Sequence, residues 1–198
     1  MPPAAPSTYA IVTLGCPKNQ VDSDKLEGTL IADGLVAAQS ADDADVVVVN
    51  TCAFIEEART ESIETILSLS EQRRDGAKLV VTGCMAERHG AELAAELPEI
   101  DQIAPFGVAL AVGAPSSAVS VSLGPTRRAP DFDLLNLPRP ASARPWAYVK
   151  IAEGCDRACG FCAIPSFRGP QRSRSLDQIL AEVDQLAAQE IVLVAQDL

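Results

Sequence analysis

The stretch VVVVNTC, residues 46–52, joins four consecutive valines to two small polar residues and a cysteine. Four β-branched residues in a row predict a strand that is buried on both faces, as in the interior of a parallel sheet. The same pattern recurs in IVTLGC, which ends at Cys16, and in LVVTGC, which ends at Cys84. The sequence therefore predicts three sheet strands, each followed by a thiol.

Helical stretches separate these strands. The pattern predicts strands at 10–14, 45–49 and 78–81, with a weaker one at 100–103, and helices at 19–34, 54–74 and 86–97. Gly34 closes the first helix and Pro98 follows the third. Alternation of strand and helix with short connections indicates an α/β fold with a parallel sheet and right-handed crossovers.

The second half of the chain is organised differently. Residues 105–145 hold seven of the fourteen prolines and little periodicity, which predicts a stiff linker. A strand at 146–151, an amphipathic helix at 176–187 and a strand at 191–195 then make one βαβ unit. Because one such unit cannot close a barrel, it reads as the start of a larger domain. We predict domains at 1–104 and 146–198, joined by the linker 105–145.

The composition and hydropathy of the sequence indicate where in the cell the protein is expected. The opening MPPAAPSTYA lacks the charged and apolar regions of a signal peptide, and the longest nearly apolar stretch, 103–115, is too short to cross a bilayer. We therefore expect a cytoplasmic protein without a membrane partner. Disulfides between the six cysteines are not expected in a reducing cytosol.

The net charge of −11 is carried by the first half of the chain. Residues 1–104 hold 7 Lys/Arg against 18 Asp/Glu, whereas residues 105–198 hold nine of each. This excess is typical of a soluble acidic domain, and it also fits a basic partner. Nucleic-acid binding through the N-terminal half is disfavoured, because it needs clustered Lys and Arg.

Three further cysteines stand close together in GCDRACGFC, residues 154–162. Cys155, Cys159 and Cys162 can converge on one metal centre. Structural zinc usually takes four ligands, and the only histidine, His89, is distant in sequence. An iron–sulfur cluster on three thiolates would leave one iron open, unlike the usual four-cysteine ligation. Buried or incidental thiols are the alternative.

This Cys-x3-Cys-x2-Cys spacing resembles the signature of the radical S-adenosylmethionine (SAM) enzymes, and Phe161 matches their aromatic residue before the third cysteine. The resemblance implies a 4Fe-4S cluster whose open iron chelates SAM. An electron from the cluster then cleaves the cofactor to a 5′-deoxyadenosyl radical. It also implies that Phe161 lies in the cofactor-binding region.

Cys16, Cys52 and Cys84 should emerge on one edge, because ligands gather outside the carboxyl ends of parallel strands. Small apolar thiols can also belong to a core, and a zinc site would again lack its fourth ligand. We favour a second three-thiolate iron–sulfur cluster. Small neighbours such as Gly15, Thr51 and Gly83 would let the backbone approach it.

An α/β domain with three such cysteines before a radical SAM motif resembles the methylthiotransferase family. The branch that modifies an aspartate of small-subunit ribosomal protein twelve is the more similar one, since the tRNA branch usually has Gln-Met-Asn after the first cysteine. The motifs that carry the resemblance are LGCPKNQVDSD (14–24), NTCAFIEEARTESI (50–63), VTGCMAER (81–88) and KIAEGCDRACGFCAIPSFRGPQRSRS (150–175).

The resemblance implies a fold and a reaction. The fold is a parallel-sheet methylthiotransferase domain followed by the start of a radical SAM (β/α) partial barrel. The radical cluster activates the β-carbon of the aspartate, the cluster at the strand-end cysteines supplies sulfur, and a second SAM supplies the methyl group. A reductant is the further partner. The alternatives are a tRNA adenosine methylthiotransferase and a non-catalytic cluster-binding module.

The arginines after the radical motif have two interpretations. Arg168, Arg172 and Arg174 form either a solvated basic patch or contacts to carboxylates of cofactor or substrate, with Arg168 the cofactor-binding candidate. The 198 residues do not include the remainder of the family's barrel or its small C-terminal β-barrel. We therefore expect the 198 residues alone to turn over poorly or not at all.

Overall fold

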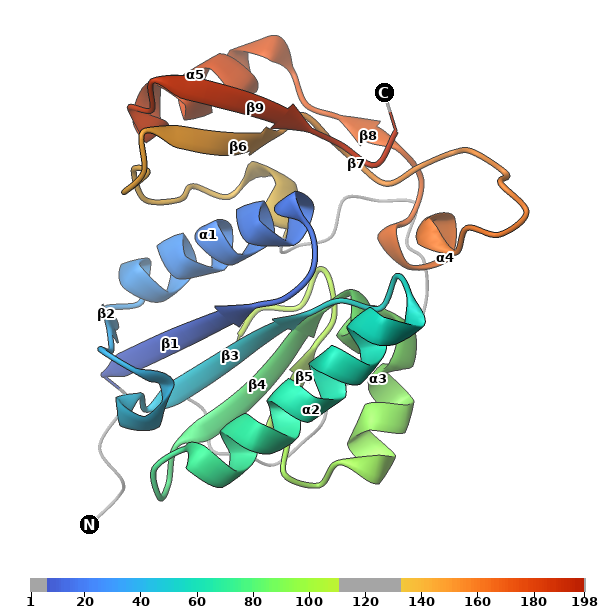
Figure 1. Cartoon of the computed structure of the whole chain (residues 1–198). Helices are drawn as coiled ribbons and strands as arrows, with labels where there is room; N and C mark the ends of the chain where they lie inside the picture. The colour runs from blue at the N-terminus through green and yellow to red at the C-terminus, as the bar shows by residue number, and fades with distance from the viewer. Residues whose placement is uncertain (1–6, 111–132, 198) are drawn as a thin grey trace.

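A computed structural model describes residues 7–110 and 133–197 of the chain (Figure 1). Its first sheet has five parallel strands in the order β2-β1-β3-β4-β5. The strands are β1 (Thr8–Thr13), β2 (Val36–Ala37), β3 (Val46–Thr51), β4 (Lys78–Gly83) and β5 (Gln102–Ala104). The predicted parallel α/β sheet is therefore confirmed.

The valines of β3 explain the position of this strand at the centre of the sheet. All six residues of β3 are buried, as the sequence predicted. Val46 and Val48 belong to one apolar cluster and Val47 and Val49 to another, because successive side chains point to opposite faces. The sheet thus has a core on each side.

Three helices cover the two faces of the sheet. They are α1 (Pro17–Ala32), α2 (Glu56–Gln72) and α3 (Cys84–Glu96). Figure 1 shows α1 on one face and α2 and α3 on the other. Leu26 and Leu30 of α1 pack with Val46 and Val48, and Ile66 of α2 packs with the opposite cluster.

The described part of the proline-rich stretch is packed against the first domain. A short 3-10 helix, η2 (Leu134–Asn136), places Leu134 in the apolar cluster beneath α1 and buries Leu135 beside it. Another 3-10 helix, η1 (Ala41–Asp43), precedes β3. Residues 111–132, the middle of the predicted linker, lie outside the described residues.

The second half contains the predicted βαβ unit. β6 (Trp146–Lys150) pairs in parallel with β9 (Glu190–Val194), and α5 (Leu176–Leu186) makes the crossover. A capping box between Ser175 and Gln178 begins α5, and Ala187, at a φ of 51°, ends it. That left-handed residue turns the chain within the short connection to β9.

Within the second domain, three short elements were not predicted from the sequence. β7 (Ala152–Glu153) pairs antiparallel with β8 (Arg172–Ser173), and α4 (Ile164–Arg168) lies between them. Two-residue strands and a five-residue helix are too short to leave a periodic pattern. None of the helices in the described ranges is long and apolar enough to cross a membrane.

The helix α1 lies between the first sheet and the β6–β9 pair (Figure 1). Its buried side chains accordingly include polar and charged groups as well as apolar ones. They are Asn19, Val21, Asp22, Ser23, Lys25, Leu26 and Leu30.

Candidate functional site

The three strand-end cysteines lie at the carboxyl edge of the first sheet. Cys16 caps the start of α1 after β1, Cys52 directly follows β3, and Cys84 is the first residue of α3 after β4. β1, β3 and β4 are neighbours and parallel, so their ends lie side by side. The expectation that the three thiols emerge on one edge is confirmed.

Two glycines let the backbone come close at this edge. A Cβ built on Gly15, whose φ is +88°, would lie 2.7 Å from Cys52 Cβ and 2.8 Å from its sulfur. A Cβ on Gly83, at a φ of +90°, would lie 2.5 Å from the carbonyl oxygen of Thr51. Glycine is therefore required at both positions, next to Cys16 and Cys84.

Asn19 ties the loops of this edge together. Its amide nitrogen donates to the carbonyl oxygens of Leu14 and Thr51, each at 2.9 Å. Its oxygen lies 3.7 Å from the sulfur of Cys84. One buried side chain thus contacts the segments before Cys16 and Cys52 as well as Cys84 itself.

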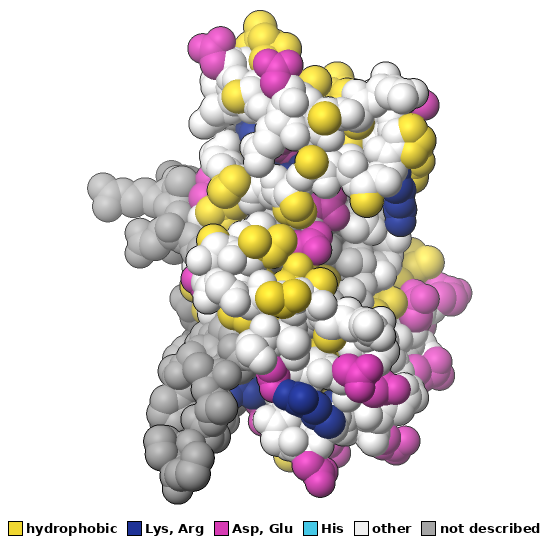
Figure 2. Space-filling model, turned by 90° about the vertical axis from the view of Figure 1, so that its left-hand side faces the viewer, with side chains coloured by type: hydrophobic (Ala, Val, Ile, Leu, Met, Phe, Trp, Pro, Cys, Tyr) yellow, Lys and Arg dark blue, Asp and Glu magenta, His cyan; other side chains and the backbone are white. Residues whose placement is uncertain are grey.

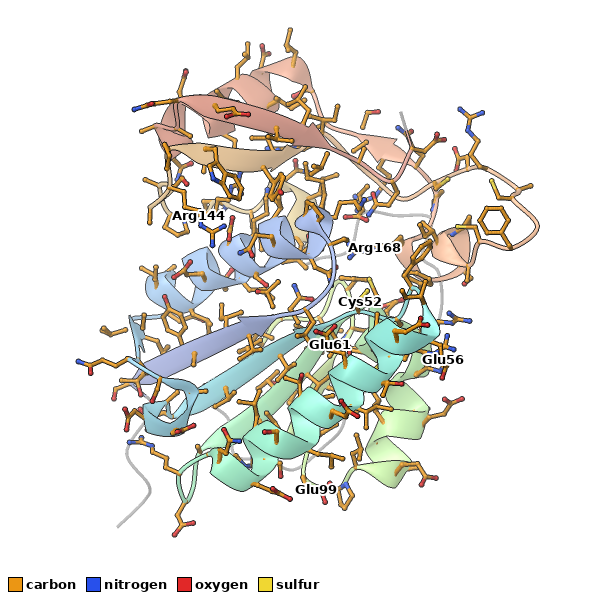
Figure 3. All side chains as sticks on the ribbon, in the orientation of Figure 1. Cys52, Glu56, Glu61, Glu99, Arg144 and Arg168 are labelled. Atoms are coloured by element: carbon orange, nitrogen blue, oxygen red, sulfur yellow. The ribbon has the colours of Figure 1, made fainter. Side chains whose placement is uncertain are left out.

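The Cys84 sulfur has a cationic neighbour from the second half of the chain. Arg168, at the end of α4, places Nη2 3.1 Å from that sulfur. Burial raises the pKa of the Cys84 thiol, and the adjacent Arg168 guanidinium acts in the opposite direction. Figure 3 shows Arg168 directed toward the strand ends, near Cys52.

The donor set of this edge suits an iron–sulfur cluster. All three cysteines are free, and thiolates are the usual ligands of such clusters. His89 pairs with Glu92 at 2.8 Å. Across residues 7–110 and 133–197, no three His, Cys, Asp or Glu side chains form a group that could hold a metal ion. The edge therefore gathers the right donors without bringing them to ligand geometry.

The second cysteine group lies in a loop after β7. Cys155 is buried, Cys162 is half-buried and Cys159 is exposed. The Cys155 amide donates to the carbonyl oxygen of Gly169 at 3.1 Å, and the Cys162 amide to that of Cys159 at 3.1 Å. Cys155 is thus held against the rest of the fold through its backbone, while the loop that carries the other two cysteines projects outward (Figure 1).

Phe161 is 92% exposed within this loop. The structure does not bring it against Arg168, which is buried. Their predicted role in cofactor binding stays a prediction for both residues, and the structure places Arg168 against the strand-end thiol of Cys84.

The interpretation of the three arginines as a solvated basic patch is wrong. Arg168 donates to Asp22 at 2.8 Å and to Asn19 at 2.6 Å. Arg174 is buried beside Glu182 at 2.5 Å. Arg172, one third exposed, pairs with Asp133 at 3.1 Å. Each guanidinium is committed to a carboxylate of the protein.

Two buried ionic networks join α1 to the second half of the chain. In one, Lys150 and Arg168 surround Asp22 and Glu153. In the other, Glu182 accepts contacts from Lys25 at 3.2 Å, Arg139 at 2.9 Å and Arg174 at 2.5 Å. Buried ions are costly unless they are paired, so these contacts fix how the two halves dock.

Sequence reasoning missed these networks. Asn19, Asp22 and Lys25 recur every three residues on α1, which places them on one helix face. That spacing was the available signal, but charged residues on a surface helix are ordinarily solvated.

Figure 2 shows one face of the molecule, on which the charged side chains can be compared with the acidity that the sequence predicts for the first domain. Acidic side chains are spread over its lower part, which the first sheet and its helices form, and basic ones are sparse there. The charge imbalance of the sequence is thus displayed on the surface.

Comparison with known families matches both halves. Residues 8–105 match the uncharacterized protein family UPF0004, and residues 149–197 match the radical SAM superfamily. The chain is 46% identical over its whole length to the ribosomal protein uS12 methylthiotransferase RimO of Myxococcus xanthus, of which it covers 43%. It is 49% identical over 94% of its length to the protein of that name from Anaeromyxobacter sp. (strain K), of which it covers 41%.

A third relative gives the same result. The uS12 methylthiotransferase RimO of Thermotoga maritima is 43% identical over 94% of the chain, which covers 44% of that relative. The chain therefore spans less than half the length of the curated relatives that it matches.

Proposed function

The chain belongs to the radical SAM methylthiotransferase family, and we propose that the whole protein inserts a methylthio group at the β-carbon of an aspartate in ribosomal protein uS12. The observation that carries the proposal is the gathering of three free thiols at the carboxyl edge of a sheet that precedes a radical SAM motif. The acidic first domain suits a basic ribosomal protein. Such a substrate would place the enzyme in the cytoplasm.

The radical SAM match implies one 4Fe-4S cluster and SAM, which together supply a carbon-centred radical when bound. Cys155, Cys159 and Cys162 are the residues proposed to hold that cluster. The buried Cys155 and its backbone bond to Gly169 would anchor one corner, and the open loop would leave room for the cofactor beside the other two thiols.

We propose that Cys16, Cys52 and Cys84 are the residues that would hold a second iron–sulfur cluster, which would supply the sulfur to be inserted. Support comes from the donor chemistry and from the close backbone approach at Gly15 and Gly83. A reductant would serve both clusters.

The first experiment counts metal. The complete protein, reconstituted without oxygen, should contain about eight irons per chain, because two cubane clusters hold four each. Replacing Cys16, Cys52 and Cys84 by Ala should leave about four, and replacing the radical-loop cysteines should leave the other four. About four irons in the unaltered protein would contradict the second cluster.

The second experiment identifies the substrate. Mass spectrometry of uS12 and of tRNA from a deletion strain should show loss of the methylthio group on uS12 alone, restored by the wild-type gene. Cys16→Ser should fail to restore it while SAM cleavage persists in the purified protein. Loss of the modification on tRNA would instead support a tRNA enzyme, and no loss on either would support a non-catalytic module.

A further inference from the structure

We propose that Arg168 is a positioning residue that completes the strand-end thiol site from the second half of the chain. Its Nη2 lies 3.1 Å from the sulfur of Cys84, a residue 84 positions earlier. The inference rests on the proposed function, because it assigns Arg168 to the second cluster and not to SAM.

The guanidinium is fixed by partners from both halves. Nη1 donates to Asp22 at 2.8 Å and to Glu153 at 3.3 Å, while Nη2 donates to Asn19 at 2.6 Å. The plane also lies over the Phe106 ring, 4.2 Å from its centroid. The side chain is 4% exposed, so the position of its donor toward Cys84 is set by the fold.

The two nitrogens have different neighbours. Nη1 faces the carboxylates, and Nη2 faces the amide oxygen of Asn19 and the sulfur of Cys84. A planar guanidinium can make both sets of contacts at once, whereas a lysine ammonium is a single point donor. The site thus uses the geometry of arginine as well as its charge.

A donor at a ligand sulfur stabilises negative charge on the cluster. Hydrogen bonds to the sulfurs are among the factors that set the reduction potential of an iron–sulfur cluster. In a buried site this effect is large, because water does not screen it. Arg168 would therefore raise the potential of the strand-end cluster, and only when α4 is docked against α1 and α3.

The test uses the full-length protein with the three radical-loop cysteines replaced by Ser, so that only the strand-end cluster loads. The midpoint potential of that cluster is measured by redox titration followed by electron paramagnetic resonance. Arg168→Gln should shift the potential to more negative values, and Arg168→Lys should shift it less. Arg73→Gln is the matched control, since Arg73 pairs with Asp101 before β5, at the opposite edge of the sheet.

The results for the two variants and the background protein distinguish between the ways in which the proposal could be wrong. Loaded protein with an unchanged potential in Arg168→Gln would overturn the inference alone. Arg168→Lys keeps a cation beside Asp22, so it covers the case in which the glutamine variant does not fold, and an unchanged potential there would equally overturn it. If the background protein loads no strand-end cluster, the proposed second cluster and this inference both fail.

Discussion

The amide oxygen of Asn19 lies 2.6 Å from Nη2 of Arg168, a residue 149 positions later in the chain. This contact joins the first helix of the first domain to the end of α4. Because the amide nitrogen of Asn19 also holds the carbonyl oxygens of Leu14 and Thr51, one side chain links two cysteine loops to the second half. The strand-end site is therefore built by both halves.

Loss of the Asn19 side chain should destabilise the protein clearly. Asn19→Ala removes the donor of two carbonyl oxygens and one of the two acceptors of Arg168 Nη2, at a cost of about 3 kcal/mol in the free energy of unfolding. Urea titration of the metal-free protein measures it. Gln20→Ala is the control, because Gln20 is half-buried and its i,i+4 contact to Asp24 contributes only about 0.5 kcal/mol. Equal losses in the two variants would refute the structural role of Asn19.

The second ionic network gives a larger effect. Glu182→Gln removes the charge shared by Lys25, Arg139 and Arg174 and should cost about 3–5 kcal/mol, since buried cations would be left without compensation. Asp184→Asn, on the exposed side of the same helix, should change stability by less than about 0.5 kcal/mol. A Glu182→Gln protein with wild-type stability in urea would show that the network is not formed.

Stability should depend on pH through Lys25. Burial lowers its pKa from 10.5 to about 8, with Glu182 opposing the shift. Between these values the unfolded chain holds one more proton than the folded one, so the Lys25 contribution to stability rises with pH. The rise is about 2 kcal/mol between pH 7.5 and 9.5.

Lys25→Met isolates this contribution. The difference in unfolding free energy between wild type and variant should grow with pH over that range, and a difference independent of pH would contradict the prediction. Measurements should stay below pH 10, because burial raises the pKa of Tyr9 to about 12 and its unfolded form ionises near 10. That ionisation favours the unfolded chain and would lower the stability of both proteins.

Alanine variants of two glycines with the same φ can distinguish the cost of backbone strain from the cost of a steric clash. Gly15 and Gly34 both have a φ of +88°, but a Cβ on Gly34 would meet no atom within 4 Å. Gly34→Ala should cost only the left-handed strain of about 1–2 kcal/mol. Gly15→Ala should cost about 1–3 kcal/mol more, since its Cβ would press on Cys52. Thermal unfolding of both variants measures the difference, and similar losses would contradict the close approach at the thiol edge.

Local pattern was enough to predict the first sheet and the position of its thiols. The four valines predicted a strand buried on both faces, and the geometry of parallel strands then brings Cys16, Cys52 and Cys84 to one edge. Helix starts differed by two residues, as at α1, which begins with Pro17 instead of residue 19.

The contacts between the halves could not be predicted in the same way. Asp22 and Arg168 are 146 positions apart, and no periodicity in either segment encodes their pairing. Their burial depends on the docking of α1 against β6, which covers a helix face that a sequence pattern assigns to solvent. The role of Arg168 thus became visible only in three dimensions.

The strand-end site is built from residues that are far apart in the sequence, and this affects how the site forms while the protein is being synthesised. Asp22 is synthesised 128 residues before Lys150. At bacterial or eukaryotic elongation rates, this separation corresponds to an interval of about 6–26 s. During that interval the first sheet can fold with the polar face of α1 in water and its thiol edge uncovered. Synthesis of α4 then brings Arg168 against Cys84, so the order of translation sets a period in which the Cys84 thiol lacks this cationic neighbour.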